Sequence, residues 1–174
     1  MSSNKSDLIM VGPKKQIFID GLSPAFNVHV FNDVKDRDAF LAEMADRVRA
    51  LAVTYSSEKV SADFMQRLPK LEIVSSFGVG YDHVDAKWAG AHGIVVTNTP
   101  DVLNEEVADT ALGLLLCTVR ELPQAERHLR AGKWTNGDYR LTASLRGRRA
   151  GIVGLGRIGK AIARRLEAFG LPVA

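Results

Sequence analysis

The stretch Gly151-Ile-Val-Gly-Leu-Gly-Arg-Ile-Gly159 decides the fold that this 174-residue chain is expected to adopt. An apolar run leads into Gly154-x-Gly156-x-x-Gly159, and a helix-like segment follows over residues 157–169. This order predicts a strand, a tight turn and a helix, the arrangement that holds the pyrophosphate of a dinucleotide. The first glycine allows the turn, the second lets the backbone approach the phosphates, and the third lets the helix pack against the strand.

The amide groups at the start of this helix would face an anion without needing a side-chain charge. Arg157 lies between the second and third glycines, so its side chain either reaches a phosphate or remains a solvated residue. The residue that reads the ribose is expected about 20 positions further on, at or beyond Ala174. The motif therefore predicts the pyrophosphate part of a cofactor site and leaves the choice between NADH and NADPH open.

The composition is typical of a soluble globular protein. Hydrophobic residues make up 46% of the chain and charged residues 25%, and a formal net charge of +3 is too small to indicate a nucleic-acid partner. The single cysteine, Cys117, excludes a disulfide within the chain and is expected to be a buried thiol in a reducing compartment. The first residues lack the apolar core of a signal peptide, and no apolar run is long enough for a membrane span. We therefore expect a cytoplasmic protein without a membrane partner.

Short β-like runs alternate with helix-like segments over the first hundred residues, which predicts a mostly parallel sheet with helices on both faces. The expected strands, rich in β-branched and aromatic residues, are 16–19, 28–31, 48–53, 71–76 and 94–97. The expected helices are 36–45, 61–68 and 85–92, with Asp36, Ser61 and Asp85 as caps. Residues 1–99 are thus interpreted as one open α/β unit of five strands.

A boundary is expected at Asn98-Thr-Pro100, because proline disfavours helix at the residue before it. A long helix over residues 105–120 follows, with Asn104 as its expected cap. It is apolar on most sides, which is typical of a helix that is buried or packs against another chain. A second helix is expected over 123–131, followed by a polar segment over 133–147.

Residues 75–85, Ser-Ser-Phe-Gly-Val-Gly-Tyr-Asp-His-Val-Asp, form the second informative stretch. It leaves an expected strand through Gly78 and Gly80, at the edge where open α/β sheets bind their ligands. The backbone amides of Val79 and Gly80 would point at a small anion such as a carboxylate; the alternative is a tight capped turn. His83 is interpreted as a turn residue, because nothing in the sequence identifies the partner that would orient a general base.

Three blocks of the chain resemble the NAD(P)-dependent D-isomer-specific 2-hydroxyacid dehydrogenases, and within them the glyoxylate/hydroxypyruvate reductases. The blocks are residues 76–85, residues 98–110 (Asn-Thr-Pro-Asp-Val-Leu-Asn-Glu-Glu-Val-Ala-Asp-Thr) and residues 151–159. The Gly132-Lys-Trp134 turn is similar to the reductase branch. The resemblance covers nearly the whole chain. It implies a flavodoxin-like substrate domain over 1–99, followed by the start of a Rossmann coenzyme domain over 100–174.

The resemblance also implies roles for individual residues. Val79 and Gly80 would bind the substrate carboxylate, and Trp134 would reach into the active site of a partner subunit. Thr110 would contact the cofactor near its nicotinamide. The pyrophosphate of NADP or NAD, with NADPH favoured, would be held by Gly154, Gly156, Arg157, Ile158 and Gly159. The helix over 105–120 would form part of a homodimer interface.

In the family that the chain resembles, the catalytic arginine, glutamate and histidine come later than the glycine motif. The four histidines here match none of them by motif or position: His29, His83, His92 and His128. The resemblance therefore implies a reductase of glyoxylate or hydroxypyruvate whose catalytic residues lie beyond residue 174, so the chain alone is expected to be inactive. Two alternatives stay open, a dinucleotide-sensing protein similar to transcriptional corepressors and an inert truncation product.

Overall fold

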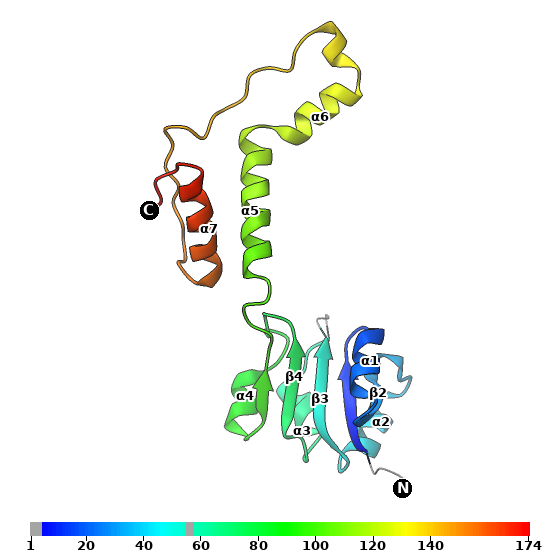
Figure 1. The fold of residues 1–174 in the computed structure, drawn as a ribbon. Helices are drawn as coiled ribbons and strands as arrows, with labels where there is room; N and C mark the ends of the chain where they lie inside the picture. Colours follow the sequence, from blue (N-terminus) through cyan, green and yellow to red (C-terminus); the bar gives the residue numbers. More distant parts are fainter. Residues whose placement is uncertain (1–4, 55–57) are drawn as a thin grey trace. The chain divides into compact units, whose positions relative to one another are not determined.

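The computed structural model describes residues 5–54 and 58–174. They divide into two compact units, Met1–Pro100 and Asp101–Ala174. Figure 1 shows the elements of both units. None of the described helices is both long and apolar enough to span a membrane.

The first unit is a five-stranded parallel sheet with the strand order β2-β1-β3-β4-β5 (Figure 1). Its strands are β1 (Ser6–Val11), β2 (Phe26–Val30), β3 (Val48–Thr54), β4 (Ile73–Phe77) and β5 (Val95–Thr97). Its helices are α1 (Gln16–Leu22), the 3₁₀ helix η1 (Phe31–Asp33), α2 (Arg37–Met44), α3 (Ala62–Gln66) and α4 (Ala86–Ala91). This order is that of flavodoxin-like sheets, so the predicted fold of the first unit is confirmed.

The main core lies between one face of the sheet and helices α2, α3 and α4. Neighbouring residues of a strand point to opposite faces, and the side chains of alternate strand residues meet those of the helices there. The core includes Ile9, Leu51, Val74, Leu41, Met65 and Ala89. Helix α1 covers part of the other face, where Phe18 meets Phe77 edge-on with ring centroids 4.7 Å apart. The carboxyl ends of the strands are thus held at one edge by a well-packed core.

The expected strand over residues 16–19 is wrong, because this segment forms most of α1. Its Ile17 is 77% exposed, so the β-branched residues there do not face a core. The first strand is instead Ser6–Val11, whose Leu-Ile-Met-Val run is almost completely buried. A central strand of a parallel sheet is covered on both faces and therefore carries a continuous apolar run rather than an alternating one.

Asp7, near the start of β1, joins three neighbouring parts of the sheet. Its carboxylate lies 2.8 Å from His29 Nε2 on β2 and 2.9 Å from Nη2 of Arg47, which immediately precedes β3. The hydrogen bond from His29 lowers the pKa of Asp7 most; burial opposes this, and Arg47 lowers the pKa further. The cluster therefore contributes stability only while Asp7 is ionised.

The second unit is built on two helices, α5 (Asn104–Val119) and α7 (Arg157–Ala168), which pack against each other (Figure 1). Between them come α6 (Leu122–Arg130) and the 3₁₀ helix η2 (Lys133–Asn136). A small core is formed by Leu112, Leu166 and Leu171.

Two details of α5 correct the sequence interpretation. The N-cap is Leu103 rather than Asn104. The side chain of Asn104 donates instead to Asp101 Oδ1 at 2.8 Å, so it is engaged one turn earlier in the chain. Cys117 is half-buried rather than buried. The expected positions of the helices are otherwise confirmed to within two residues at each end.

The segment before the glycine motif is extended, as expected, but it forms one parallel bridge rather than a full strand. Ala150 N donates to Pro172 O at 2.9 Å, and Ile152 N donates to Ala174 O at 2.8 Å. A strand is defined by a ladder of consecutive bridges, and these hydrogen bonds make one isolated bridge, between Ala150 and Val173. The order is nevertheless extended segment, turn, helix α7 and a second parallel segment, which is the β–α–β order that the motif predicts.

Candidate functional site

The loop after β4 is tied to the segment after β5 through its carbonyl groups. Thr99 N donates to Gly78 O at 3.0 Å, and Asn98 Nδ2 donates to Val79 O at 2.8 Å. In a planar trans peptide the N–H points opposite to the C=O of the same peptide group. The N–H groups of Val79 and Gly80 therefore both point away from residues 98 and 99.

These two amide groups lie at the carboxyl edge of the sheet, where ligands of open α/β folds bind. Gly80 is exposed and Val79 is half-buried, so the loop is open to solvent. A Cβ at Gly78 would lie 3.3 Å from Gly80 O, which shows how sharply the loop turns. Consecutive amides in such a turn form an anion-binding concavity, so the loop is suited to a small carboxylate.

Histidine side chains are engaged elsewhere in the fold. His83 lies in the turn, as interpreted, and is buried with its Nε2 3.0 Å from Ser76 Oγ. His29 is held by Asp7, His92 stacks on Trp88 with ring centroids 3.8 Å apart, and His128 Nε2 lies 3.3 Å from Gly137 O. Each histidine thus has a local partner that holds its ring. No group of three or more His, Cys, Asp or Glu side chains in residues 5–54 and 58–174 is placed to hold a metal ion.

The three glycines of the motif have three different surroundings. Gly154 has a φ of +98°, which an L side chain rarely adopts. A Cβ at Gly156 would have no neighbour within 4 Å, whereas a Cβ at Gly159 would lie 2.2 Å from Gly154 O. The first glycine therefore makes the turn, the second leaves space above the backbone, and the third lets α7 pack onto the turn. This is the arrangement that a pyrophosphate cradle requires, so the residues fit a dinucleotide.

The first turn of α7 faces the same space. Gly156 is its N-cap, and the amides of a first helical turn have no acceptor within their own helix. They also carry the positive end of the helix dipole. Arg157 is exposed, and its Nε lies 3.2 Å from Asp101 Oδ1. Ile158 is half-buried. The turn therefore combines backbone donors with a nearby cation, Arg157.

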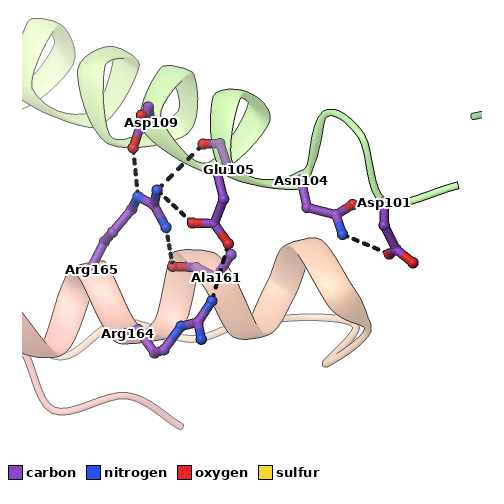
Figure 2. Close-up of polar contacts among 7 residues, drawn as sticks. All are labelled: Asp101, Asn104, Glu105, Asp109, Ala161, Arg164 and Arg165. Atoms are coloured by element: carbon purple, nitrogen blue, oxygen red, sulfur yellow. Dashed lines mark hydrogen bonds and ion pairs between the residues drawn. The ribbon is translucent and has the colours of Figure 1, made fainter.

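Two other arginines of α7 are used to hold α5 (Figure 2). Arg165 Nε lies 2.6 Å from Asp109 Oδ1, and its Nη2 lies 2.8 Å from Glu105 Oε2. Arg164 contacts Glu105 at 3.2 Å. The hydrogen bonds to Asp109 and then Glu105 raise the pKa of Arg165, so its guanidinium stays charged. These cations fix the helix that carries the turn.

Thr110 and Trp134 occupy exposed positions. The Thr110 hydroxyl donates to Glu106 O at 2.8 Å, within α5. Trp134 lies on η2 with 58% of its surface exposed, after Gly132 at a φ of +68°. In the described structure the Thr110 hydroxyl is thus bonded within its own helix rather than to the glycine motif, and Trp134 faces solvent.

The sequence did not indicate that the side chains of two polar residues hold other parts of the site. Asn98 holds the Val79 carbonyl, and Asp101 holds Arg157. The signal that could have indicated them is their position on either side of Pro100, where the chain leaves the first unit.

Residues 10–169 match the family described as D-isomer specific 2-hydroxyacid dehydrogenase, catalytic domain. Among curated proteins, the chain is 42% identical over 166 residues to the glyoxylate/hydroxypyruvate reductase A of Arabidopsis thaliana, covering 95% of this chain and 53% of that protein. It is 48% identical over 135 residues to the hydroxyphenylpyruvate reductase of Plectranthus scutellarioides, covering 78% of this chain and 43% of that protein.

Solved structures give the same result. A 2-hydroxyacid dehydrogenase from Ketogulonicigenium vulgare aligns with a TM-score of 0.90 and 41% identity, over 97% of this chain and 53% of that one. The NADPH-dependent glyoxylate/hydroxypyruvate reductase of Sinorhizobium meliloti, in complex with NADP and malonate, aligns with a TM-score of 0.80 and 48% identity, over 98% and 53%.

The chain thus spans about half the length of the relatives that it matches. The family match, in contrast, extends over nearly all of the chain, from the end of β1 to the end of α7. It includes both the loop after β4 and the glycine motif. The chain belongs to the D-isomer-specific 2-hydroxyacid dehydrogenase family.

Proposed function

We propose that this chain supplies the substrate-carboxylate loop and the pyrophosphate turn of a nicotinamide-dependent reductase. The reductase converts a small 2-keto acid to the 2-hydroxy acid, either hydroxypyruvate to the D-2-hydroxy acid or glyoxylate to glycolate, which is achiral. The observation that carries the proposal is the geometry of two backbone turns, one at Val79–Gly80 and one at Gly154–Gly159, whose amides are suited to an anion. The names of the relatives support the substrate class.

In this proposal residues 1–99 are the substrate domain and residues 100–174 belong to the coenzyme domain. The Val79 and Gly80 amides bind the carboxylate of the keto acid and so orient its carbonyl group. The turn binds the pyrophosphate through backbone amides of residues 156–158, with Arg157 adding a positive charge. The dinucleotide, NADPH or NADH, supplies the hydride when bound. NADPH is favoured because the Sinorhizobium meliloti relative is described as NADPH-dependent.

The described residues provide binding rather than proton transfer. Reduction of a keto group needs a proton donor within hydrogen-bond distance of the keto oxygen. Each of the four histidines is held by a local contact: His29, His83, His92 and His128. We therefore propose that residues 1–174 alone do not turn over a keto acid.

The proposed partner is a second copy of the chain, bound through the α5 region. Helix α5 buries Ala108 and Leu112 against its own unit, whereas Val107 and Leu114 are 42% and 63% exposed. Trp134 adds another large exposed apolar side chain. Val107 and Leu114 have the i, i+7 spacing that places side chains on one face of a helix, and exposed apolar side chains that share a face are typical of an interface. A dimer would therefore be expected to dissociate on Leu114→Glu, as measured by sedimentation velocity.

A chimera tests the proposed function directly. Residues 1–174 replace the matching part of the Sinorhizobium meliloti reductase, and NADPH oxidation is followed with glyoxylate and with hydroxypyruvate. The chimera is expected to oxidise NADPH only when a keto acid is present. Residues 1–174 alone are expected not to oxidise NADPH with either keto acid. A folded chimera that binds NADPH but reduces neither keto acid would contradict the reductase and favour a dinucleotide-sensing protein.

A further inference from the structure

Asp101 is the first residue of the second unit, and its carboxylate is held beside the arginine of the glycine motif. Arg157 Nε lies 3.2 Å from Asp101 Oδ1, and the same oxygen accepts a hydrogen bond from Asn104 Nδ2 at 2.8 Å (Figure 2 shows the Asn104 contact). Asp101 has a φ of +71°, in the left-handed region, where Asp and Asn are enriched among non-glycine residues. The carboxylate is thus held in place by backbone and side chain together.

We propose that Asp101 holds Arg157 in the free chain and competes for it with the pyrophosphate of the dinucleotide. This inference rests on the proposed function, because it requires an anion to bind at Gly154–Gly159. The guanidinium forms its strongest contacts with charged acceptors when its planar fork faces them. A guanidinium that pairs with the Asp101 carboxylate is partly neutralised, and it cannot at the same time turn its fork fully toward a phosphate. Binding of the anion and pairing with Asp101 weaken each other by the same factor.

The exposure of the paired side chains indicates which arginine of α7 can leave its acidic partner for a phosphate. The side chains of Arg157 and Asp101 are 67% and 53% exposed, and pairs of this kind contribute little to stability. Arg165, in contrast, is 24% exposed and contacts Asp109, Glu105 and the Ala161 carbonyl. Arg165 is therefore expected to stay paired with the carboxylates of α5 when a phosphate occupies the glycine turn, whereas Arg157 can change partner at small cost. The competition between Asp101 and the phosphate for Arg157 is expected to alter the affinity for the cofactor by up to about fivefold.

The variant Asp101→Asn isolates the charge of this carboxylate. Asparagine has the same shape, also tolerates a left-handed backbone, and retains an oxygen that accepts from Asn104. The chain carrying Asp101→Asn is expected to bind NADPH and inorganic pyrophosphate about two- to fivefold more tightly than the unchanged chain. Glu126→Gln on α6 removes one negative charge that pairs with Arg130. It is the control for net charge and is expected to leave both affinities unchanged.

A double-mutant cycle separates competition from simple charge repulsion. Arg157→Gln is expected to weaken NADPH binding, and Asp101→Asn is expected to have no further effect in the Arg157→Gln background. Equal tightening in both backgrounds would overturn the proposal, because Asp101 would then act without Arg157. Unchanged or weaker binding by Asp101→Asn alone would also overturn it.

An NMR measurement on the chain without ligand distinguishes a failure of this inference from a failure of the proposed function. The NMR signal of the Arg157 Nε–H is expected to differ between the unchanged chain and Asp101→Asn, and to move toward the Asp101→Asn position when pyrophosphate is added. A signal that is identical in the two free chains would contradict the ion pair. Absence of NADPH and pyrophosphate binding by a chain with the ion pair would instead contradict the proposed function, and the competition with it.

Discussion

At the scale of the residue, single atoms determine the geometry of both proposed anion sites. Gly159 admits no side chain because the oxygen of Gly154 occupies the space of its Cβ. Asn98 orients a peptide group through one hydrogen bond to Val79 O. The glycine spacing could be predicted to make a turn, but the role of Asn98 could not, because the hydrogen bond joins two loops that follow different strands. Local patterns in a sequence do not indicate which loops meet.

Gly159→Ala tests the contact within the glycine motif. The added methyl group would overlap a backbone oxygen, so α7 must shift, which is expected to cost about 1–3 kcal/mol in unfolding free energy. NADPH binding, measured by fluorescence titration, is expected to weaken more than about tenfold, the factor that 1.4 kcal/mol represents. Gly90→Ala on α4 is the control. Its Cβ would have no neighbour within 4 Å, and it is expected to retain NADPH affinity and to unfold no more easily. Equal affinities for Gly159→Ala and the unchanged chain would contradict the packing argument.

Asn98→Ala tests the orientation of the carboxylate loop. Loss of the hydrogen bond to Val79 O frees the peptide group that presents the Gly80 amide, so glyoxylate binding is expected to weaken by about two- to tenfold. The measurement is a glyoxylate titration followed by the amide NMR signals of Val79 and Gly80. Asn27→Ala removes a comparable bond from an asparagine side chain to Lys5 O on the opposite side of the sheet. If both variants bind glyoxylate as the unchanged chain does, the loop is not the carboxylate site.

At the scale of the element, the sequence predicts types of structure better than their partners. The α-helices after α1 and the last four strands follow from periodicity and capping residues, and Asp36, Ser61 and Asp85 accept the expected amide hydrogen bonds. The error over residues 16–19 has a physical cause. β-branched residues favour strands only where a neighbouring strand and a core are available, and α1 lies outside the sheet. The salt bridges that join α5 to α7 were likewise not predictable, because they connect residues about 56–59 positions apart.

Arg165→Gln tests how α7 is held against α5. Arg165 is mostly buried and has two acidic partners, whereas Arg164 is 70% exposed and has one. Amide hydrogen exchange over α7 is expected to become about five- to tenfold faster in Arg165→Gln, because local opening is easier when charged hydrogen bonds are lost. Arg164→Gln, the matched control, is expected to change exchange by less than about twofold. Equal acceleration in both variants would show that neither arginine is favoured as the anchor.

Asp7→Asn tests the cluster that joins β1, β2 and β3. The pKa of Asp7 is lowered in the folded chain, so its contribution to stability is complete above the unfolded pKa of about 3.9. That contribution is lost as the pH falls through the lower folded pKa. At pH 7 the variant is expected to be about 1–3 kcal/mol less stable in urea unfolding, and the difference should shrink below pH 4.

The control for this comparison is Asp38→Asn. Asp38 pairs with Arg67 but is 88% exposed, so its loss is expected to change stability by less than about 0.5 kcal/mol at either pH. The difference in unfolding free energy between Asp7→Asn and the unchanged chain is expected to depend on pH. A difference that is the same at pH 7 and pH 3 would contradict the role assigned to the ionised carboxylate.

At the scale of the whole molecule, the chain joins two units, and we propose that each of them offers backbone donors to an anion. In the first unit these donors follow a strand of a parallel sheet, and in the second they lie at the start of a helix. Neither proposed site needs a buried charge, so each could be indicated by glycine-rich sequence alone. The resemblance to the family depended on the combination of the motifs, because each of them alone is also compatible with a simple turn.

An amide-resolved NMR titration of the chain with NADPH tests the proposed cofactor site most directly. We expect saturable shifts that are largest at residues 155–159, with the signals around Asp7 unchanged. Saturation that leaves the glycine motif unaffected, or shifts centred on another part of the chain, would contradict the proposed site.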